Sequence, residues 1–156
     1  RILYEKYLKQ LKEEKRSSQQ ELFPQNISLS LSDAGLLEDL LGELATLGFN
    51  VNKLGQTSFV VNGVPEGLAD ADMQKILEQV LENYKNNMIG LDLDKKINVA
   101  RSLAVKMALK TGNKLHVEEM RSIVDSLFAC NVPEVTPDGE KTYTILSLDK
   151  LQKLFN

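Results

Sequence analysis

Few residues of the types that most often do chemistry occur in this sequence. Its 156 residues include a single histidine and a single cysteine. One cysteine excludes an internal disulfide and fits a reducing compartment. The net charge of −3 also lacks the basic excess of domains that hold nucleic acid by themselves. The charge therefore argues against this chain as a main DNA-binding surface.

Long apolar runs are absent as well. No run approaches the roughly 18 residues that a membrane-spanning helix needs, and no signal peptide is visible. Apolar residues make up 42% and charged residues 26% of the chain, which is typical of a globular domain of ordinary size. We therefore expect a cytoplasmic protein with no membrane contact. Because the chain starts at Arg1 and not at a methionine, we also expect a piece of something longer.

Metal and catalytic sites lack most of their usual parts. His116 and Cys130 stand at opposite ends of one predicted helix, roughly 21 Å apart at 1.5 Å per residue, so they cannot share a metal. His116 is expected to begin that helix, and Cys130 is more simply a small buried hydrophobe. Asp92 and Asp94 resemble a two-carboxylate pair, but a helix start explains them better. With no glycine-rich phosphate loop, we predict no metal, no cofactor and an interaction module instead of an enzyme.

Hydrophobic periodicity predicts a mixture of helices and strands. Helices are expected at 2–15, 32–47, 73–84, 97–108 and 116–128, with a short last helix after Ser147. Strands are expected at 27–31, at 49–54 and 58–64 as a hairpin, and at 141–146. This order favours an α+β fold over a doubly wound parallel sheet.

Three residues mark the expected ends of these elements. Ser32 is a good cap for the second helix, and Gly48 can close that helix in a left-handed conformation. Pro24 lacks a backbone donor, so it belongs at a sheet edge or before a strand. Residues 86–93 are expected to form a connector.

A short peptide before the first strand is the clearest positive signal. Gln19-Gln20-Glu21-Leu22-Phe23 has a glutamine, two variable residues and then Leu-Phe, as in peptides that dock on the bacterial sliding clamp. Leu22 and Phe23 can fill an apolar pocket as anchors, and the glutamine can bond backbone groups beside it. Gln20 in place of Gln19 gives a second possible register. The alternative is that Leu22 and Phe23 begin the strand and belong to the core.

Several segments, taken in order, resemble the C-terminal domain of the MutL family of DNA mismatch repair proteins. They correspond to the end of its acidic opening motif, its clamp-docking strand, its hairpin, its Ala-Cys-Lys/Arg helix, its Cys-Pro-His-Gly-Arg-Pro loop and its terminal Phe-x-Arg motif. The matching residues are 1–7, 20–31, 48–65, 100–112, 135–141 and 154–156. The likeness runs in the right order over nearly all of the chain.

Departures from the family pattern fall on its metal ligands. The cysteine of the helix motif falls on Val105, and the cysteine and histidine of the loop fall on Thr136 and Asp138. Valine cannot ligate zinc, threonine does so poorly, and one aspartate would hold a cation weakly. Glu5 matches the last acidic residue of the opening motif. The resemblance therefore implies a MutL of the non-nicking kind, in which Glu5 is a solvent-facing helix residue.

The resemblance also implies an organisation and a role. Residues 1–31 with 94–156 would form a dimerisation part, and 32–93 an inserted, smaller helix–hairpin–helix regulatory part. The homodimer would join two distant ATPase domains into a ring-shaped clamp on DNA. Other mismatch repair proteins, and the sliding clamp through the peptide at 19–23, would be its partners, and DNA would be held by the full-length protein.

The dimer face stays open at this point. The apolar residues of the last helix are candidates, although a core assignment is equally consistent: Leu148, Leu151, Leu154 and Phe155. Two rival interpretations remain. One is a metal-dependent nicking endonuclease domain of the same family, and the other is a generic α+β domain with an accidental likeness.

Overall fold

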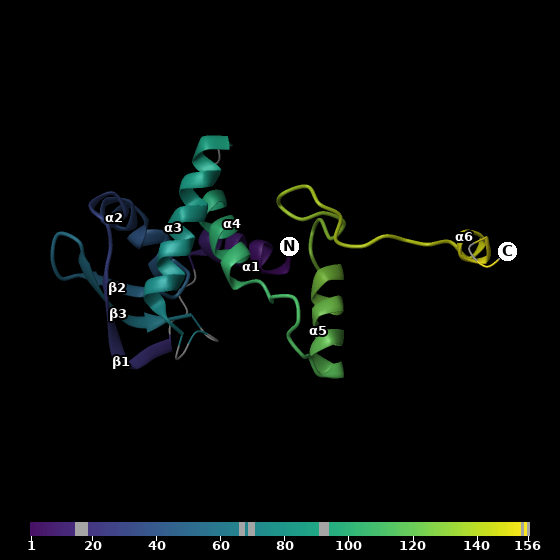
Figure 1. Cartoon of the computed structure of the whole chain (residues 1–156), viewed down its shortest axis with the longest axis horizontal. Coiled ribbons are helices and arrows are strands. Elements are labelled where there is room, and N and C mark those ends of the chain that lie inside the picture. Colours follow the sequence, from purple (N-terminus) through teal and green to yellow (C-terminus); the bar gives the residue numbers. More distant parts are fainter. Residues whose placement is uncertain (15–18, 66–67, 69–70, 91–93, 154, 156) are drawn as a thin grey trace. The chain divides into compact units, whose positions relative to one another are not determined.

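A computed structural model describes residues 1–14, 19–65, 68, 71–90, 94–153 and 155 (Figure 1). For residues 19–23 and 89–90 it describes the backbone alone. The chain forms two compact units: a larger unit, Leu3–Thr111, and a smaller unit, Gly112–Asn156 with Arg1–Ile2. The elements are α1 Ile2–Glu13, β1 Gln19–Ser28, α2 Leu31–Thr46, β2 Asn50–Lys53, β3 Ser58–Val64, α3 Met73–Gly90, α4 Lys95–Met107, α5 Val117–Phe128 and α6 Leu148–Gln152. Helices with a small antiparallel sheet confirm the predicted α+β class.

The sheet of the larger unit has three strands in the order β1-β3-β2. The predicted hairpin forms, since β2 and β3 pair antiparallel with Lys53 opposite Phe59. β1 runs antiparallel along the other side of β3, with Ile27 opposite that same phenylalanine. β1 therefore lies at an edge of the described sheet, while β3 lies at its centre.

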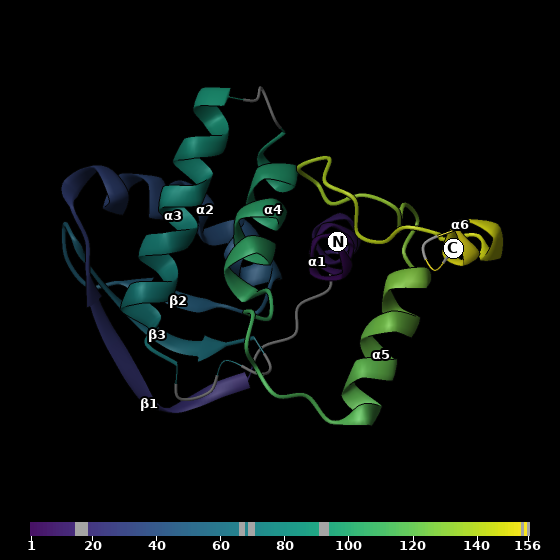
Figure 2. The ribbon, with the colours of Figure 1, turned by 45° about the vertical axis from the view of Figure 1, so that its right-hand side comes forward.

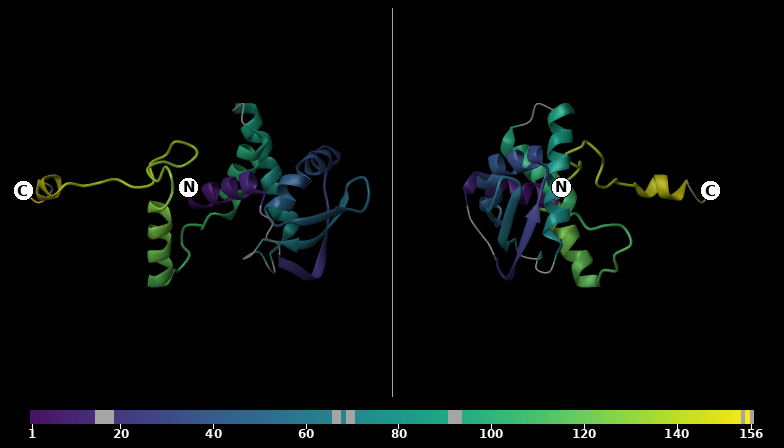
Figure 3. Two further views of the ribbon diagram at one scale, coloured as in Figure 1. Left: turned by 180° about the vertical axis from the view of Figure 1, so that it is seen from behind. Right: turned by 60° about the vertical axis from the view of Figure 1, so that its left-hand side comes forward.

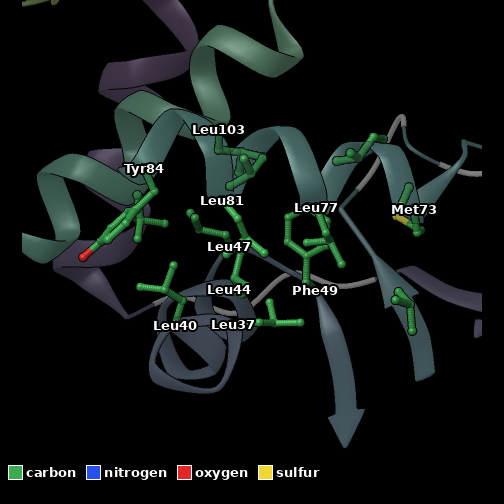
Figure 4. Close-up of a cluster of buried hydrophobic side chains, with 14 of the residues drawn as sticks. Leu37, Leu40, Leu44, Leu47, Phe49, Met73, Leu77, Leu81, Tyr84 and Leu103 are labelled. Atoms are coloured by element: carbon green, nitrogen blue, oxygen red, sulfur yellow. The ribbon is translucent and has the colours of Figure 1, made fainter. Parts of the chain in front are cut away.

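One apolar core joins the sheet to α2, α3 and α4. Side chains from α2, α3, α4 and the turn before β2 point toward one another (Figure 4). Alternate residues of β3 are buried, as its period of two requires. The largest fully buried side chains include Phe49, Phe59, Leu37, Leu40, Leu44, Leu47, Met73, Leu77, Leu81 and Leu103.

A polar contact lies between the neighbouring helices α3 and α4 (Figure 2). The buried Asn98 side chain donates to the Tyr84 carbonyl at 3.1 Å and accepts from the Asn87 side chain at 2.9 Å. The buried Ser102 hydroxyl donates to Asn98 at 3.3 Å. Small residues on α4 allow this close approach, and Ala100 is fully buried.

Most of the expected helix ends are confirmed, and two are corrected. Gly48 closes α2 with a φ of +100°, and its amide donates to the Ala45 carbonyl at 3.1 Å. Ser30, and not Ser32, caps α2, because its hydroxyl accepts from the Asp33 amide at 3.1 Å. The segment 86–90, expected as a connector, continues α3.

Asp94 begins α4 as expected. Its carboxylate accepts from the amides of Lys96 and Ile97 at 2.9 and 3.4 Å. Asp92, the other member of the suspected carboxylate pair, lies outside the described residues. Capping therefore accounts for Asp94 without a metal.

The smaller unit contains α5, a loop and α6. An isolated antiparallel bridge joins Val135 to Lys141, but the strand predicted at 141–146 does not form. Figure 3 shows residues 143–147 as an extended run that leads to α6. Ser147 caps α6 as predicted, and its hydroxyl accepts from the Lys150 amide at 3.4 Å.

The predicted division into 1–31 with 94–156 and an inserted 32–93 stays a prediction. Within the larger unit, β1 pairs with β3 and α3 packs on α4, so elements on both sides of the expected boundaries share one core. Within the described part of the chain, every helix is too short or too polar to cross a membrane.

Candidate functional site

The docking segment, defined as Gln19–Phe23, forms the first half of the edge strand β1. Its backbone is placed, but its side chains lie outside the described residues. This applies to all four predicted docking residues, Gln19, Gln20, Leu22 and Phe23. Pro24 follows the segment and is exposed, as expected for a proline on an edge strand.

The pairing of β1 with β3 is interrupted at this segment. Gln20 lies opposite Gly63, and pairing resumes with Gln25 opposite Val61. Four residues of β1 between these positions therefore face a single residue of β3, Asn62. Ordinary bulges insert one extra residue and re-aim the side chains beside it. Here four residues, 21–24, face one residue of β3, and these four include Leu22 and Phe23.

Two glutamine side chains fix the second half of β1 against the start of α3. Gln25 donates to the Ala71 carbonyl at 2.9 Å and accepts from the Met73 amide at 3.1 Å. Gln74 donates to the Ser28 carbonyl at 2.7 Å and accepts from the amide of the same serine at 2.9 Å. The strand is thus held firmly on one side of the register break.

Helix α5 presents an apolar stripe to its surroundings. All twelve of its residues are described, and none of them is buried. Val117, Met120 and Val124 are 51%, 46% and 52% exposed and recur at spacings of three and four, so they share one helix face. With Arg121 and Asp125 they line an open hollow of about 320 Å³.

The other side of α5 meets the rest of its own unit. Ile123 and Leu127 are half-buried. Phe128 lies at the end of the helix with its ring centroid 5.1 Å from that of Tyr143. The exposed stripe is therefore a second apolar surface, additional to the one that the smaller unit uses internally.

The candidate dimer residues of the last helix are exposed too. Leu148, Leu151 and Phe155 are 77%, 42% and 83% exposed, and their assignment to a dimer face stays a prediction. Leu154 lies outside the described residues. Ile145 and Leu146, in the extended run before α6, are exposed as well.

The loop 135–141 satisfies its own polar groups. The Thr136 hydroxyl accepts from the amides of Asp138 and Glu140 at 3.2 and 3.1 Å. The Thr136 amide donates to the Glu140 carbonyl at 2.7 Å, and Gly139 takes a φ of +85°. Thr136 thus acts as a turn residue that organises the loop backbone.

The other positions that match the family's metal ligands are Val105 and Glu5. Val105 is an exposed residue of α4, and Glu5, on α1, is half-buried and so less solvent-facing than expected. Among the described residues, no three or more His, Cys, Asp or Glu side chains are grouped so that they could hold a metal ion.

His116 and Cys130 stand at the two ends of α5, as predicted. The His116 amide donates to the Glu119 carboxylate at 2.7 Å, so this pair closes the first turn of the helix. The Cys130 thiol is half-buried and lies 3.4 Å from the Ser126 carbonyl. Both residues therefore have structural roles at the helix ends.

Comparison with known proteins identifies the family. The sequence profile described as "MutL C terminal dimerisation domain" matches residues 1–115, which is well over half of the chain. The chain belongs to the MutL C-terminal dimerisation domain family. The profile covers α1 to α4 with the sheet.

Relatives match over nearly the whole of this MutL-family chain. The DNA mismatch repair protein MutL of Chlorobaculum tepidum is 39% identical over 155 residues, which are 99% of this chain and 25% of that protein. The MutL proteins of Chlorobium chlorochromatii and Chlorobaculum parvum are 36% and 37% identical over 99% of this chain, and 24% and 25% of their own lengths are covered. The chain spans about a quarter of the length of these relatives.

The exposed stripe on helix α5 of this MutL-family domain is not among the dimer-face candidates of the sequence analysis. The spacing of Met120, Val124 and their neighbours predicts an apolar side on this helix, whereas the predicted dimer face lies on the last helix. The usable signal was the strong segregation of apolar and polar residues on α5. That pattern predicts a covered face without saying what covers it.

Proposed function

We propose that this MutL-family domain pairs with a second copy of itself and so joins two longer MutL chains. The observation that carries the proposal is the apolar stripe of α5, whose residues Val117, Met120 and Val124 are about half exposed. An amphipathic helix of a globular protein normally buries such a stripe. The exposed leucines of α6 support the same proposal.

The length of α5 adds a physical reason. Isolated helices shorter than about 12–15 residues are marginal in water, and packing supplies most of their stability. With twelve residues and none of them buried, α5 gains little from its own unit. A partner that covers the stripe would supply the missing packing.

In the longer protein, the dimer would hold two ATPase domains together in a ring-shaped clamp on DNA. The DNA contacts would then belong to the full-length protein, which agrees with the charge of −3 on this chain. Other mismatch repair proteins would dock on the assembled dimer. This role would place the protein in the cytoplasm, where bacterial DNA lies.

Light scattering on a sizing column, at several concentrations, tests the pairing directly. The 156-residue chain has a mass of 17.5 kDa, and we expect a species of twice that mass that persists on dilution. A species of 17.5 kDa at the highest concentration would contradict the proposal.

We further propose that Gln19 or Gln20, with Leu22 and Phe23, docks on the DNA sliding clamp. The register break supports this, because it takes Leu22 and Phe23 out of the regular ladder of an edge strand. The hydrogen bonds of the Gln25 and Gln74 side chains support it as well, since they hold the strand beside the break. Two adjacent apolar anchors suit a preformed pocket on a partner.

Surface plasmon resonance on immobilised sliding clamp tests this docking. Replacing Leu22 and Phe23 together with alanine should abolish binding while the circular dichroism spectrum stays unchanged. The matched control is Leu54→Ala, which removes an exposed leucine from the β2–β3 turn and should leave binding intact. Equal binding by the double variant and the wild type would refute the docking role.

The alternative is a metal-dependent nicking endonuclease domain. Val105, Thr136 and Asp138 stand where the family pattern has its cysteine and histidine ligands, and this disfavours it. A nicking assay on supercoiled DNA with added manganese decides the matter. Nicking that is lost on Glu5→Ala and on Asp138→Ala would establish the alternative.

A further inference from the structure

The outer edge of β1, the side that faces away from β3, is occupied at Ser28 by a side chain from α3. The amide of Leu29, which follows β1, donates to the Thr57 carbonyl at 2.9 Å, so the backbone groups of Leu29 point toward the β3 side. Backbone groups alternate in direction along an antiparallel strand, so those of Ser28 and Asn26 point outward. An outward row of this kind is a template on which a further strand can pair.

Gln74 of α3 bonds both outward groups of Ser28. Its Oε1 accepts from the Ser28 amide at 2.9 Å, and its Nε2 donates to the Ser28 carbonyl at 2.7 Å. These are the two backbone groups that a neighbouring strand would bond in an antiparallel ladder. The carboxamide of Gln74 therefore takes the place of one peptide group of an added strand.

Glu78 orients the Gln74 carboxamide. Nε2 of Gln74 also donates to the Glu78 carboxylate, one turn further along α3. An ionised carboxylate only accepts hydrogen bonds, so it fixes the NH2 end of the carboxamide and leaves the oxygen for the Ser28 amide. The oxygen and both N–H groups of Gln74 are thereby used, and the side chain is held in the position that covers the strand.

Two further features restrict the same edge. Gln25 bonds the Ala71 carbonyl and the Met73 amide, so the start of α3 is tied beside β1 where the helix meets the sheet (Figure 2). Pro24 has no backbone N–H, so it offers an added strand no donor. A helix laid along an edge and a proline within it both keep other strands from pairing there.

We propose that Gln74 is an edge guard, a side chain that blocks the addition of a further strand along residues 26–28. A partner that approaches β1 as an extended peptide is thereby confined to the docking segment before Pro24. The inference goes beyond the proposed function and does not depend on it, because it concerns neither the pairing of two copies nor the identity of a docking partner.

A strand-forming peptide tests the guard. Residues 58–64 pair with the inner side of β1, so a fluorescein-labelled peptide of residues 57–64 is a suitable probe for the outer side. Fluorescence anisotropy with the 156-residue chain measures its binding. Gln74→Ala should bind the peptide roughly tenfold or more tightly than the wild type, because it frees two backbone groups of Ser28. The same peptide with Val60→Pro and Asn62→Pro cannot form a ladder and should bind neither protein.

The matched control is Gln79→Ala, which removes the same kind of side chain from an exposed position of the same helix. It should bind the peptide no more tightly than the wild type. Gln74→Met keeps the bulk of the side chain without its hydrogen bonds and should behave as Gln74→Ala does. Hydrogen exchange by NMR gives a second readout, since the Ser28 amide should exchange about tenfold faster in both Gln74 variants.

Peptide binding by the Gln74 variants, but not by the wild type or Gln79→Ala, supports the edge guard. Equal binding by the wild type and the Gln74 variants overturns it. Faster exchange at Ser28 without peptide binding overturns it as well, because Gln74 would then be a local contact that excludes nothing. Each of these results holds for a monomer and for a dimer, so failure of the guard leaves the proposed function standing.

Discussion

Asn98 ties two helices of the larger unit together through one amide group. Its side chain is 1% exposed and bonds the Tyr84 carbonyl and the Asn87 side chain. Asn98→Leu would remove these bonds and the acceptor of the buried Ser102 hydroxyl, at a cost of about 1–3 kcal/mol in the free energy of unfolding. Urea denaturation measures the loss, and Asn86→Leu, at an exposed position of α3, should cost little. Equal stability of the two variants would contradict the role of Asn98.

Asp33 should make stability depend on pH. The hydrogen bond from Lys85, at 2.8 Å, lowers the pKa of the Asp33 carboxyl below its ordinary value of 3.8, and the Ser30 hydroxyl adds to this. Because the folded pKa is depressed, the stabilisation is complete above pH 3.8 and disappears as the pH falls through the lower folded value.

The variant Asp33→Asn should therefore lose stability at pH 7 and show a smaller further loss between pH 4 and pH 2. Denaturation at both ends of that window measures the difference, and Asp39→Asn on the same helix is the control. An unchanged pH profile in Asp33→Asn would show that the Lys85 contact contributes nothing.

Residues that act within a single helix turn were the easiest to predict from the sequence. Gly48, Asp94 and His116 mark helix ends because each satisfies backbone groups within its own turn. The cap of α2 was predicted wrongly, because Ser30 and Ser32 can both cap a helix. The end of β1 at Ser28 decides between them, and sheet pairing with a distant segment sets that end.

Elements with their own local partners were also predictable, namely the hairpin and helices α1 to α5. The strand expected at 141–146 was not, because an extended segment becomes a strand only where another strand pairs with it. The periodicity of Thr142 to Leu146 carries no information about such a partner. The apolar stripe on α5 has the same limit as a predictor. Its spacing predicts that the stripe is buried, but not which surface buries it.

Within the core, α3 contributes through residues such as Leu77, which is fully buried (Figure 4). Leu77→Ala removes three carbon atoms and leaves a cavity between α3 and its neighbours, so the free energy of unfolding should fall by about 2–5 kcal/mol. Leu54→Ala, at an exposed site, is the matched control and should change it by less than about 0.5 kcal/mol. Similar losses in both variants would contradict the assignment of the core.

At the scale of the whole molecule, pairing links stability to concentration. Mass action adds about 1.4 kcal/mol per dimer for each tenfold rise in concentration, which corresponds to roughly 1–3 °C in Tm for chains of this size. We expect the Tm of the wild type to rise by that amount in differential scanning calorimetry. A wild-type Tm that does not change with concentration would contradict a dimer.

The interrupted pairing of β1 also leaves this strand longer than the part of β3 that it faces. Three residues beyond those that Asn62 needs opposite it correspond to roughly 10 Å of extended chain. A protein that binds Leu22 and Phe23 could draw them away from the sheet by part of that length. The ladder from Gln25 to Ser28 would stay closed meanwhile, held by the two glutamines. The conformational change on binding would then stay within the docking segment. The core beneath β3 would keep its packing.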